Sequence, residues 1–392
     1  MHSYNGLFDN MLTDDAMTVA FIDASENKRD RDDVRKVLDN LSFHKGKLRK
    51  ILRDEKFKII KHTPCIINEA NCHKEREIVK PYYKYEQVVH HLIVGQLKPI
   101  IMKGFYEYSC GSIPKRGCHY GKRNLERWIK KFPENSRIYV LKMDVRHFFE
   151  NIDHDILKNK LSEVIRDKKF LKLLFQIIDA HEKGLPLGYY PSQWLANFYL
   201  KAFDHFVKEV LGADFYMRYM DDMVILDTDK YRLHEMCKAI KEYLGVRLKL
   251  ELKDNWQVFP LAVNSDDKEG RCLDFMGFKF YRNMTTLRKS ILCRTRRKAN
   301  KIDKKNSTGK NVTWKDATSM ISYMGWIDHT KTYQYYLDYI KPKVIIRSMK
   351  HKVSKHNRKE NKHDRLETSS WYTIGKAVRG RFLFEYKYCV SA

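Results

Sequence analysis

Two adjacent aspartates stand inside an apolar, strand-forming run. Asp221 and Asp222 interrupt the segment 215–226, whose other members are mostly apolar or aromatic. On an extended strand their carboxylates would point to opposite faces, and an unpaired carboxylate in a core is costly. A tight hairpin turn removes the conflict because it presents both acids at its tip. The pattern predicts such a hairpin, with an ordinary solvent-exposed turn as the alternative interpretation.

A third aspartate, Asp144, follows another apolar run that starts at Ile138. Acids at neighbouring strand ends can hold two magnesium ions, which prefer oxygen ligands and keep positions open for substrate phosphates. Two such ions hold the attacking and leaving oxygens of an in-line phosphoryl transfer. The three aspartates together predict polymerase chemistry with two Mg²⁺ ions, or Mn²⁺ in their place.

The composition agrees with a partner that carries many phosphates. The 392 residues include 76 Lys and Arg against 49 Asp and Glu, which gives a formal net charge of +27, and 43% are hydrophobic. This hydrophobic content excludes a disordered chain. The charge favours nucleic acid, because neutralising phosphates releases counterions, while anionic lipid or a merely solvated surface are alternatives. The sequence shows no apolar run that could span a bilayer and no secretory signal, so we expect a cytoplasmic protein.

Periodicity indicates the elements that would hold these residues. Apolar spacing predicts helices over 82–102, 123–132, 155–182, 193–211, 320–327 and 333–340. Residues rich in β-branched and apolar side chains predict strands over 138–145, 216–226 and 271–282. The mixture predicts an α+β fold.

Four segments, in a fixed order, resemble the reverse transcriptases of bacteria and phages. Asp144 with Phe148 and Phe149 is similar to the first palm motif, and the stretch 184–197 is similar to the second. The stretch 219–222 (Tyr-Met-Asp-Asp) is similar to the third, and 273–278 is similar to the primer-grip hairpin. The resemblance covers about residues 75–345, and the motifs are specific as a set.

The resemblance implies a right-hand polymerase, in which fingers, a palm of antiparallel sheet with helices, and a helical thumb surround a basic cleft. With the charge pattern it predicts the following divisions: an N-terminal extension over 1–45, fingers over 46–136, the palm over 137–283 with a fingers insertion at 156–183, the thumb over 284–345 and a basic C-terminal tail over 346–392. The tail is expected to bind RNA or to be flexible.

The resemblance also implies catalytic roles. Asp144 and Asp221 would bind metal ions, with Asp222 as a supporting ligand and the backbone carbonyl of Val145 as a further one. Lys253 would protonate the leaving pyrophosphate, with an ordinary surface lysine as the alternative.

Phe149 lies where the family has an aromatic side chain that clashes with a ribose 2′-OH. It would therefore select deoxynucleotides. A core aromatic is the alternative interpretation, and Phe148 beside it leaves the register open by one residue.

Further residues are expected at the substrates. The predicted nucleotide-binding residues are Arg76, Lys80, Lys115 and Arg116 in the fingers, and Leu187, Gly188, Ser192 and Gln193 in the second motif. The predicted template-primer residues are Gly277, Arg294, Arg296, Arg297 and Lys298. A solvated helix face is the alternative interpretation for the basic residues.

The second motif departs from that of many relatives because Leu187 precedes its glycine and Ser192-Gln193 ends it. This variant resembles the reverse transcriptases of diversity-generating retroelements, which copy a template RNA with errors at adenines. Leu187 offers no hydrogen bond to the nascent pair, so we expect relaxed discrimination. Phage-defence reverse transcriptases, which copy a non-coding RNA, share parts of the signature and are the alternative.

The resemblance implies a structured template RNA, a cDNA product and dNTPs as partners, and no membrane. A small basic accessory protein or a homo-oligomer is left open. Two other functions keep the fold: an inactive, maturase-like RNA-binding scaffold, against which the three intact aspartates argue, and an RNA-dependent RNA polymerase, against which Phe149 argues. Intron mobility is a weaker interpretation, because the basic tail shows no paired-cysteine or histidine nuclease motif.

Overall fold

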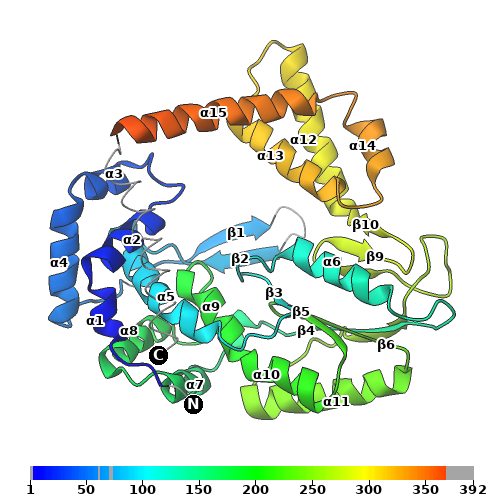
Figure 1. Ribbon diagram of the computed structural model, residues 1–392, viewed down its shortest axis with the longest axis horizontal. Coiled ribbons are helices and arrows are strands. Elements are labelled where there is room, and N and C mark those ends of the chain that lie inside the picture. Colours follow the sequence, from blue (N-terminus) through cyan, green and yellow to red (C-terminus); the bar gives the residue numbers. More distant parts are fainter. Residues whose placement is uncertain (1–2, 61, 70–73, 368–392) are drawn as a thin grey trace.

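The computed structural model describes residues 3–60, 62–69 and 74–367 of the chain. Mixed helices and sheets form it, so the predicted α+β class is confirmed (Figure 1). None of the described helices is both long and apolar enough to cross a membrane.

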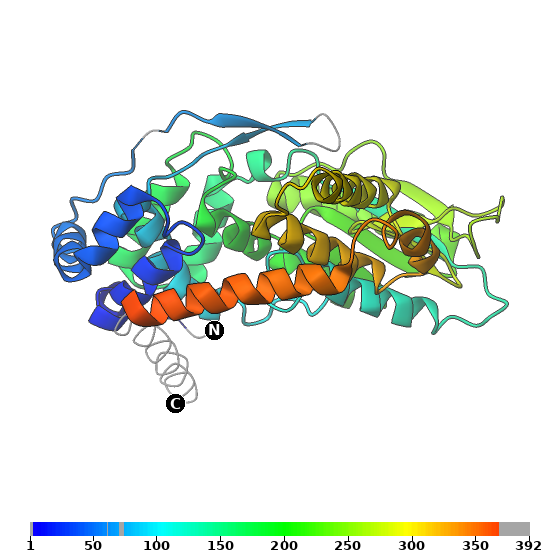
Figure 2. The same ribbon diagram turned by 90° about the horizontal axis from the view of Figure 1, so that it is seen from above.

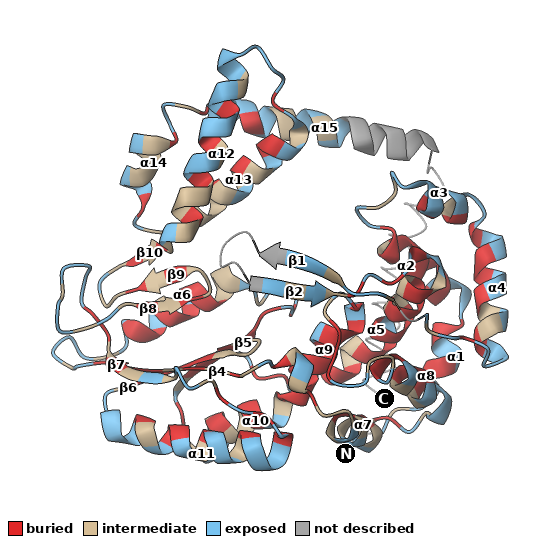
Figure 3. Ribbon diagram, turned by 180° about the vertical axis from the view of Figure 1, so that it is seen from behind, coloured by how far each residue is buried: buried red, intermediate tan, exposed pale blue. Residues whose placement is uncertain are grey.

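Helices gather around a buried central helix in the first part of the chain. These elements are α1 (Leu7–Met11), α2 (Asp14–Ala24), α3 (Asp32–Asp39), α4 (Leu41–Arg53), the π-helical η1 (Tyr83–Gln87) and α5 (Val88–Ile101). α5 contacts α1, α2 and η1, and apolar residues of α1, α2 and α5 belong to one core cluster. β1 (Cys65–Glu69) and β2 (Lys74–Ile78) form an antiparallel hairpin, and its residues 65–67 and 75–78 are exposed or half-buried, whereas most of α5 is buried (Figure 3).

A five-stranded sheet lies at the centre of the molecule. Its strands are β3 (Ser109–Cys110), β4 (Tyr139–Asp144), β5 (Phe215–Tyr219), β6 (Asp222–Asp227) and β7 (Gln257–Pro260), in the order β3-β5-β6-β4-β7. All neighbours are antiparallel except β3 and β5. The strands predicted over 138–145 and 216–226 correspond to β4 and to the β5–β6 hairpin.

Side chains alternate between the two faces of this sheet, as the period of a strand requires. Val140 and Val224 belong to the core cluster that includes α6 (Cys118–Ile129). Leu141 and Ile225 belong to the other cluster, which includes α11 (Lys230–Leu248). Helices therefore cover both faces, as Figure 1 also shows.

Further helices connect these strands. They are η2 (Phe149–Asn151), α7 (His154–Val164), α8 (Lys168–Ile178), α9 (Tyr190–Tyr199), α10 (Lys201–His205) and the π-helical η3 (Phe206–Val210). The single helix predicted over 155–182 is wrong, because the chain is extended at Ile165 and Asp167 then caps α8 by accepting the N–H of Phe170 at 3.0 Å.

A small sheet and four helices complete the described chain. The strands β8 (Leu273–Phe275), β9 (Phe278–Phe280) and β10 (Thr285–Leu287) precede α12 (Lys289–Ser307), α13 (Trp314–Ile327), α14 (Tyr333–Tyr339) and α15 (Ile346–Glu367). α13 contacts α12 and α15, and α15 runs back toward α2 and α3 (Figure 2). Part of the predicted basic tail is thus α15, while 368–392 lie outside the described residues. The division into fingers, palm and thumb stays a prediction.

Candidate active site

Strand pairing brings the three aspartates together. β4 and β6 pair with Asp144 directly opposite Asp222. Met220 and Asp221 form the turn between β5 and β6, with Met220 at φ 56°. The N–H of Val145 donates to the carbonyl oxygen of Asp221 at 3.2 Å, which ties this turn to the end of β4. The hairpin predicted from the acid pair is present, and its acids lie beside a third on the neighbouring strand.

The environment of Asp221 and Asp222 disfavours their charged form. Burial raises the pKa of Asp222 to about 7; Lys142 lowers it, while Asp144 and Asp221 raise it. Burial also raises the pKa of Asp221, and the charge of Asp144 adds to this rise. Oδ1 of Asp222 is buried and has no hydrogen-bond partner among the described residues. A cation at this position would relieve both the repulsion and the missing contact.

Lys253 lies at the carboxylates because its backbone pairs with the end of β4. Its N–H donates to the carbonyl oxygen of Asp144 at 2.8 Å, and Val145 forms an antiparallel bridge with Leu252. This pairing puts the ammonium Nζ of Lys253 2.6 Å from Oδ1 of Asp144. A cation is therefore held next to the acids by main-chain geometry.

Lys142 is a second cation at the site, which the sequence reasoning missed. Its Nζ lies 3.9 Å from Oδ2 of Asp222 and donates to the carbonyl oxygen of Asp274 at 2.6 Å. Arg288 in turn pairs with the Asp274 carboxylate at 2.6 Å. The sequence could have indicated this position, because Lys142 precedes Asp144 by two residues and therefore lies on the same face of β4.

Arg218, which the sequence reasoning also missed, supports the turn between β5 and β6 from inside the core. Its side chain is 1% exposed and pairs with both carboxylate oxygens of Asp204, at 2.7 and 2.6 Å. It also donates to Oγ of Ser109 at 2.6 Å, to Oδ1 of Asn197 at 3.2 Å and to the carbonyl oxygen of Met220 at 2.8 Å. The sequence could have indicated this role, because an arginine inside an apolar strand needs buried partners for its charge.

The predicted residues of the second motif line a cavity of about 310 Å³ together with Phe149. They are Leu187, Gly188, Ser192 and Gln193. Phe148 is only 2% exposed and belongs to the core, whereas Phe149 is half-buried and reaches the cavity. Of the two neighbouring rings, the second one is therefore available to a ligand.

Gly188 joins the second motif to the end of the β1–β2 hairpin. Its φ is +107°, and a Cβ there would lie 2.0 Å from the carbonyl oxygen of Val79. The N–H of Val79 donates to the carbonyl oxygen of Leu187 at 2.8 Å. A side chain at position 188 would push these two segments apart.

The predicted cations of the fingers lie in different surroundings. Arg76 on β2 is close enough that its charge lowers the pKa of Asp221. Lys80, just after β2, and Lys115, in the loop after β3, are exposed. Arg116 donates to the carbonyl oxygen of Tyr106 at 2.9 Å, so its guanidinium is tied back to the protein. The structure thus brings Arg76 near the carboxylates, while Lys80 and Lys115 face solvent.

Gly277 lies in the turn between β8 and β9. Met276 and Gly277 both have positive φ, at 52° and 86°, as the preferred two-residue hairpin turns allow. A Cβ on Gly277 would lie 2.9 Å from Cδ1 of Ile291 on α12 and 3.1 Å from the ring of Trp326 on α13. This hairpin therefore lies directly against the helices that follow it.

The four basic residues predicted to contact template-primer follow one another on α12 but differ in their contacts. The guanidinium of Arg296 lies 4.4 Å from the ring centre of Tyr339, and Lys298 pairs with Asp316 at 2.7 Å. Arg294 is half-buried and donates to a backbone carbonyl one turn earlier, while Arg297 is exposed. Lys298 thus holds α12 to α13, whereas Arg296 and Arg297 are both exposed.

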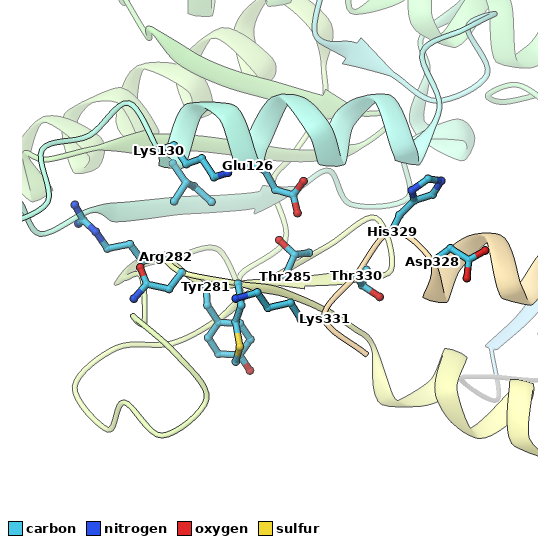
Figure 4. Close-up of a pocket in the computed structure, with 12 residues that line it drawn as sticks. Glu126, Lys130, Tyr281, Arg282, Thr285, Asp328, His329, Thr330 and Lys331 are labelled. Carbon is cyan, nitrogen blue, oxygen red and sulfur yellow. The ribbon is translucent and has the colours of Figure 1, made fainter. Parts of the chain in front are cut away.

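Another cavity, of about 390 Å³, lies between α6, the β9–β10 turn and the segment 328–331 (Figure 4). Its labelled side chains carry both signs of charge, with Glu126 and Asp328 beside Lys130 and Lys331. None of the three aspartates or the second-motif residues lines it. We assign no catalytic role to this cavity.

Among the described residues, no group of three or more His, Cys, Asp or Glu side chains is arranged to hold a metal ion by itself. Magnesium does not require such a cage, because it is often bound by one or two carboxylates together with substrate phosphates and water. The all-oxygen donors at Asp144, Asp221 and Asp222 and the unpartnered Oδ1 of Asp222 fit this mode of binding.

Comparison with known proteins identifies a family to which the chain is similar. The sequence model of the family described as reverse transcriptase (RNA-dependent DNA polymerase) matches residues 67–280. The group II intron-encoded protein LtrA of Lactococcus lactis subsp. cremoris is 25% identical over 257 residues, covering 62% of this chain and 41% of that protein. Protein YkfC of Escherichia coli (strain K12) is 25% identical over 134 residues, covering 32% and 35%. The chain thus spans less than half the length of these relatives.

Among solved structures, telomerase from Candida albicans in complex with a fragment of telomeric RNA is similar. The TM-score is 0.45 at 12% identity, and the match covers 74% of this chain and 58% of that chain.

Proposed function

The chain belongs to the reverse transcriptase family, whose model matches more than half of its length, and from this premise we propose that it copies an RNA template into complementary DNA. Its α+β fold is that of a right-hand polymerase. The observation that carries the proposal is the register of the central sheet, which sets Asp144 opposite Asp222 with Asp221 in the adjoining turn.

Asp144, Asp221 and Asp222, with the backbone carbonyl of Val145, would hold Mg²⁺. When bound, two such ions stabilise the attacking and leaving oxygens of an in-line phosphoryl transfer. The 3′-hydroxyl of the growing strand attacks the α-phosphorus of a dNTP, so a phosphodiester bond forms and pyrophosphate leaves. Lys253 would deliver a proton to that pyrophosphate from its position beside Asp144.

The substrate residues are proposed on the same basis. Phe149 would exclude a ribose 2′-OH, and Arg76 with Lys80 and Lys115 would contact the triphosphate. Arg294, Arg297 and the hairpin at Gly277 would contact template and primer.

Labelled dNTP incorporation on an RNA template with a DNA primer tests the activity. We expect Mg²⁺-dependent incorporation by the wild type and a loss of at least about 100-fold in Asp221→Asn, because one ligand carboxylate is removed. Asp266→Asn, in an exposed loop, is the matched control and should keep full activity. Equal incorporation by Asp221→Asn would contradict the assignment. Tight RNA binding with no incorporation by the wild type would favour the scaffold function.

Within this activity we propose error-prone copying of a dedicated structured RNA, as in diversity-generating retroelements. The support is Leu187, which lines the cavity beside Phe149 and cannot hydrogen-bond a base pair. Antiphage defence with a non-coding RNA template is the second candidate, since its enzymes share parts of the second motif. A small basic accessory protein or a second copy of the chain would be further partners.

Sequencing of the cDNA made by the wild type and by Leu187→Gln distinguishes the diversity-generating role from the defence role. Errors concentrated opposite template adenines, and reduced in Leu187→Gln, are expected for the diversity-generating role. Faithful or repetitive cDNA would favour defence. An unchanged error spectrum in the variant would show that Leu187 does not set discrimination.

A further inference from the structure

The cavity beside Phe149 has a second wall that no proposed catalytic role uses. This wall is formed by Lys28 after α2, Gln87 and His90 with His91 around the start of α5, and Tyr189 with Tyr190 at the start of α9. The cavity therefore extends from the proposed nucleotide site to the N-terminal helices.

Aromatic rings dominate this second wall. His91 and Tyr190 stack with ring centres 4.2 Å apart and planes 12° from parallel, and Tyr190 remains 42% exposed. His90 and Tyr189 form a second ring pair at 4.6 Å. Flat rings at the edge of an open cavity suit an unpaired nucleobase, because every base has a face that stacks on aromatic side chains.

His90 adds an unused hydrogen-bonding group. It is only 2% exposed, and its Nδ1 is buried with no hydrogen-bond partner among the described residues. Burial lowers the pKa of His90 to about 3, so the ring is neutral and carries one donor and one acceptor. A buried polar atom without a partner is costly, and a ligand with a complementary edge would remove this cost.

The charge of the second wall favours a nucleotide within a strand over a free nucleoside triphosphate. Burial also lowers the pKa of His91, to about 4, so Lys28 alone is charged among the described residues that line the cavity. Lys28 donates to the carbonyl oxygen of Ala24 at 2.9 Å and to Oε1 of Gln87 at 2.5 Å, which leaves its third N–H for a ligand. One lysine matches the single phosphate of a nucleotide within a strand, whereas a triphosphate needs several cations.

We propose that this cavity receives the unpaired template nucleotide immediately ahead of the base being copied, with the base against the exposed ring of Tyr190 and the His91 ring stacked beside it, and its phosphate at Lys28. The inference rests on the proposed function, because it requires a template. It makes Lys28 and Tyr190 template-positioning residues, contributed to the second wall by two segments that are distant in the sequence.

The test compares binding of two primer–templates that differ by one nucleotide. In the first the template ends at the base to be copied, and in the second one unpaired nucleotide follows it. We expect the wild type to bind the second at least about fivefold more tightly, because stacking of one base contributes that much. Tyr190→Ala and Lys28→Ala should each bring the ratio of affinities close to one. Lys36→Ala, an exposed lysine on α3, should keep the wild-type ratio.

Photo-crosslinking supplies a readout that does not depend on affinity. A template with 5-iodouridine one position ahead of the copied base should crosslink to Tyr190, and the same label five positions ahead should not. Crosslinking of Tyr190 by 5-iodo-dUTP instead would assign the cavity to the incoming nucleotide and overturn the inference. A wild-type ratio of one would also overturn it. Normal dNTP incorporation alongside either result leaves the proposed function standing, whereas absent incorporation refutes that function separately.

Discussion

The position of Phe149 is set by its backbone. Its carbonyl oxygen accepts the N–H of Leu185 at 2.7 Å. Gly184, at φ +68°, lies so close that a Cβ there would be 2.3 Å from the same oxygen. The second motif thus fixes where the ring of Phe149 can lie in the cavity.

Replacing this ring tests its role in sugar selection. Phe149→Ala should raise the efficiency of ribonucleotide relative to deoxynucleotide incorporation by about 10- to 100-fold, because it removes the contact that would exclude a 2′-OH. The ratio of kcat/KM values for rNTP and dNTP measures this. Phe43→Ala, whose side chain is exposed, should leave the ratio as in the wild type. The same sugar preference in both variants would refute the assignment.

Arg218 should dominate the stability of the turn that carries Asp221. Arg218→Met leaves the buried carboxylate of Asp204 without its cation, so we expect the free energy of unfolding to fall by about 3–5 kcal/mol. Denaturant unfolding of the variant and of Arg53→Met, an exposed control, measures the difference. Adding Asp204→Leu to Arg218→Met should recover part of the loss, because the uncompensated charge is then gone. No recovery would show that the lost packing, and not the charge, sets the cost.

The acidic residues of the proposed active site could be predicted from the sequence, whereas several cationic residues around them could not. The doublet Asp221-Asp222 contradicts its apolar surroundings, so it is visible in the chain itself. Lys28 carries no such local contradiction, and Lys142 is marked only by its place two positions before Asp144 on β4. Their roles follow from pairing between β4 and β6 and from packing of the N-terminal helices on α5, and both contacts join segments that are distant in the sequence.

At the scale of elements, Asp316 holds two helices together. It accepts hydrogen bonds from Lys298 at 2.7 Å and Lys305 at 2.5 Å on α12, and it forms a capping box with Thr313 at the start of α13. Burial opposes ionisation of Asp316, but these hydrogen bonds prevail and hold its pKa well below the ordinary value.

The pH dependence of this contact has a definite sign. When the pKa of a carboxyl is lower in the folded state than in the unfolded state, its ionisation stabilises the folded state at pH values above the unfolded pKa of about 4. This contribution is lost as the pH falls. Asp316→Asn should therefore lower the thermal midpoint at pH 7, with a smaller difference from the wild type at about pH 3. Asp328→Asn is the matched control from the end of the same helix. A difference that stays constant with pH would contradict the ionic role of Asp316.

Strands were easier to predict than short helices. β4 and the β5–β6 hairpin are rich in apolar, β-branched and aromatic residues, so composition identifies them. α1 to α4 were not predicted, because many charged residues, acidic up to about residue 40 and basic in α4, hide buried positions such as Met17 and Phe21 in helices of few turns. The extended residue Ile165 between α7 and α8 likewise has no composition signal.

At the scale of the whole molecule, the net charge of +27 should make RNA binding depend strongly on salt. We expect an affinity loss of at least about 100-fold between roughly 50 and 200 mM salt, since each neutralised phosphate releases counterions. Filter binding across this range measures the slope. The slope is that of log affinity against log salt concentration, and each phosphate contact contributes about one to it. Arg297→Ala should therefore reduce the slope by about one. Arg49→Ala should leave it unchanged, because Arg49 already pairs with Asp14 at 3.1 Å. A flat salt response would argue against a phosphate-dominated interface.

The buried guanidinium of Arg218 also bears on the order in which the protein folds. Its partners lie 14, 21 and 109 positions away in the sequence, on α10, on α9 and on β3. A charged group enters an apolar interior readily only when its partners are already present, so the turn between β5 and β6 should become rigid after these segments have docked. The carboxylates of the proposed active site would then be among the last parts of the chain to reach their final positions.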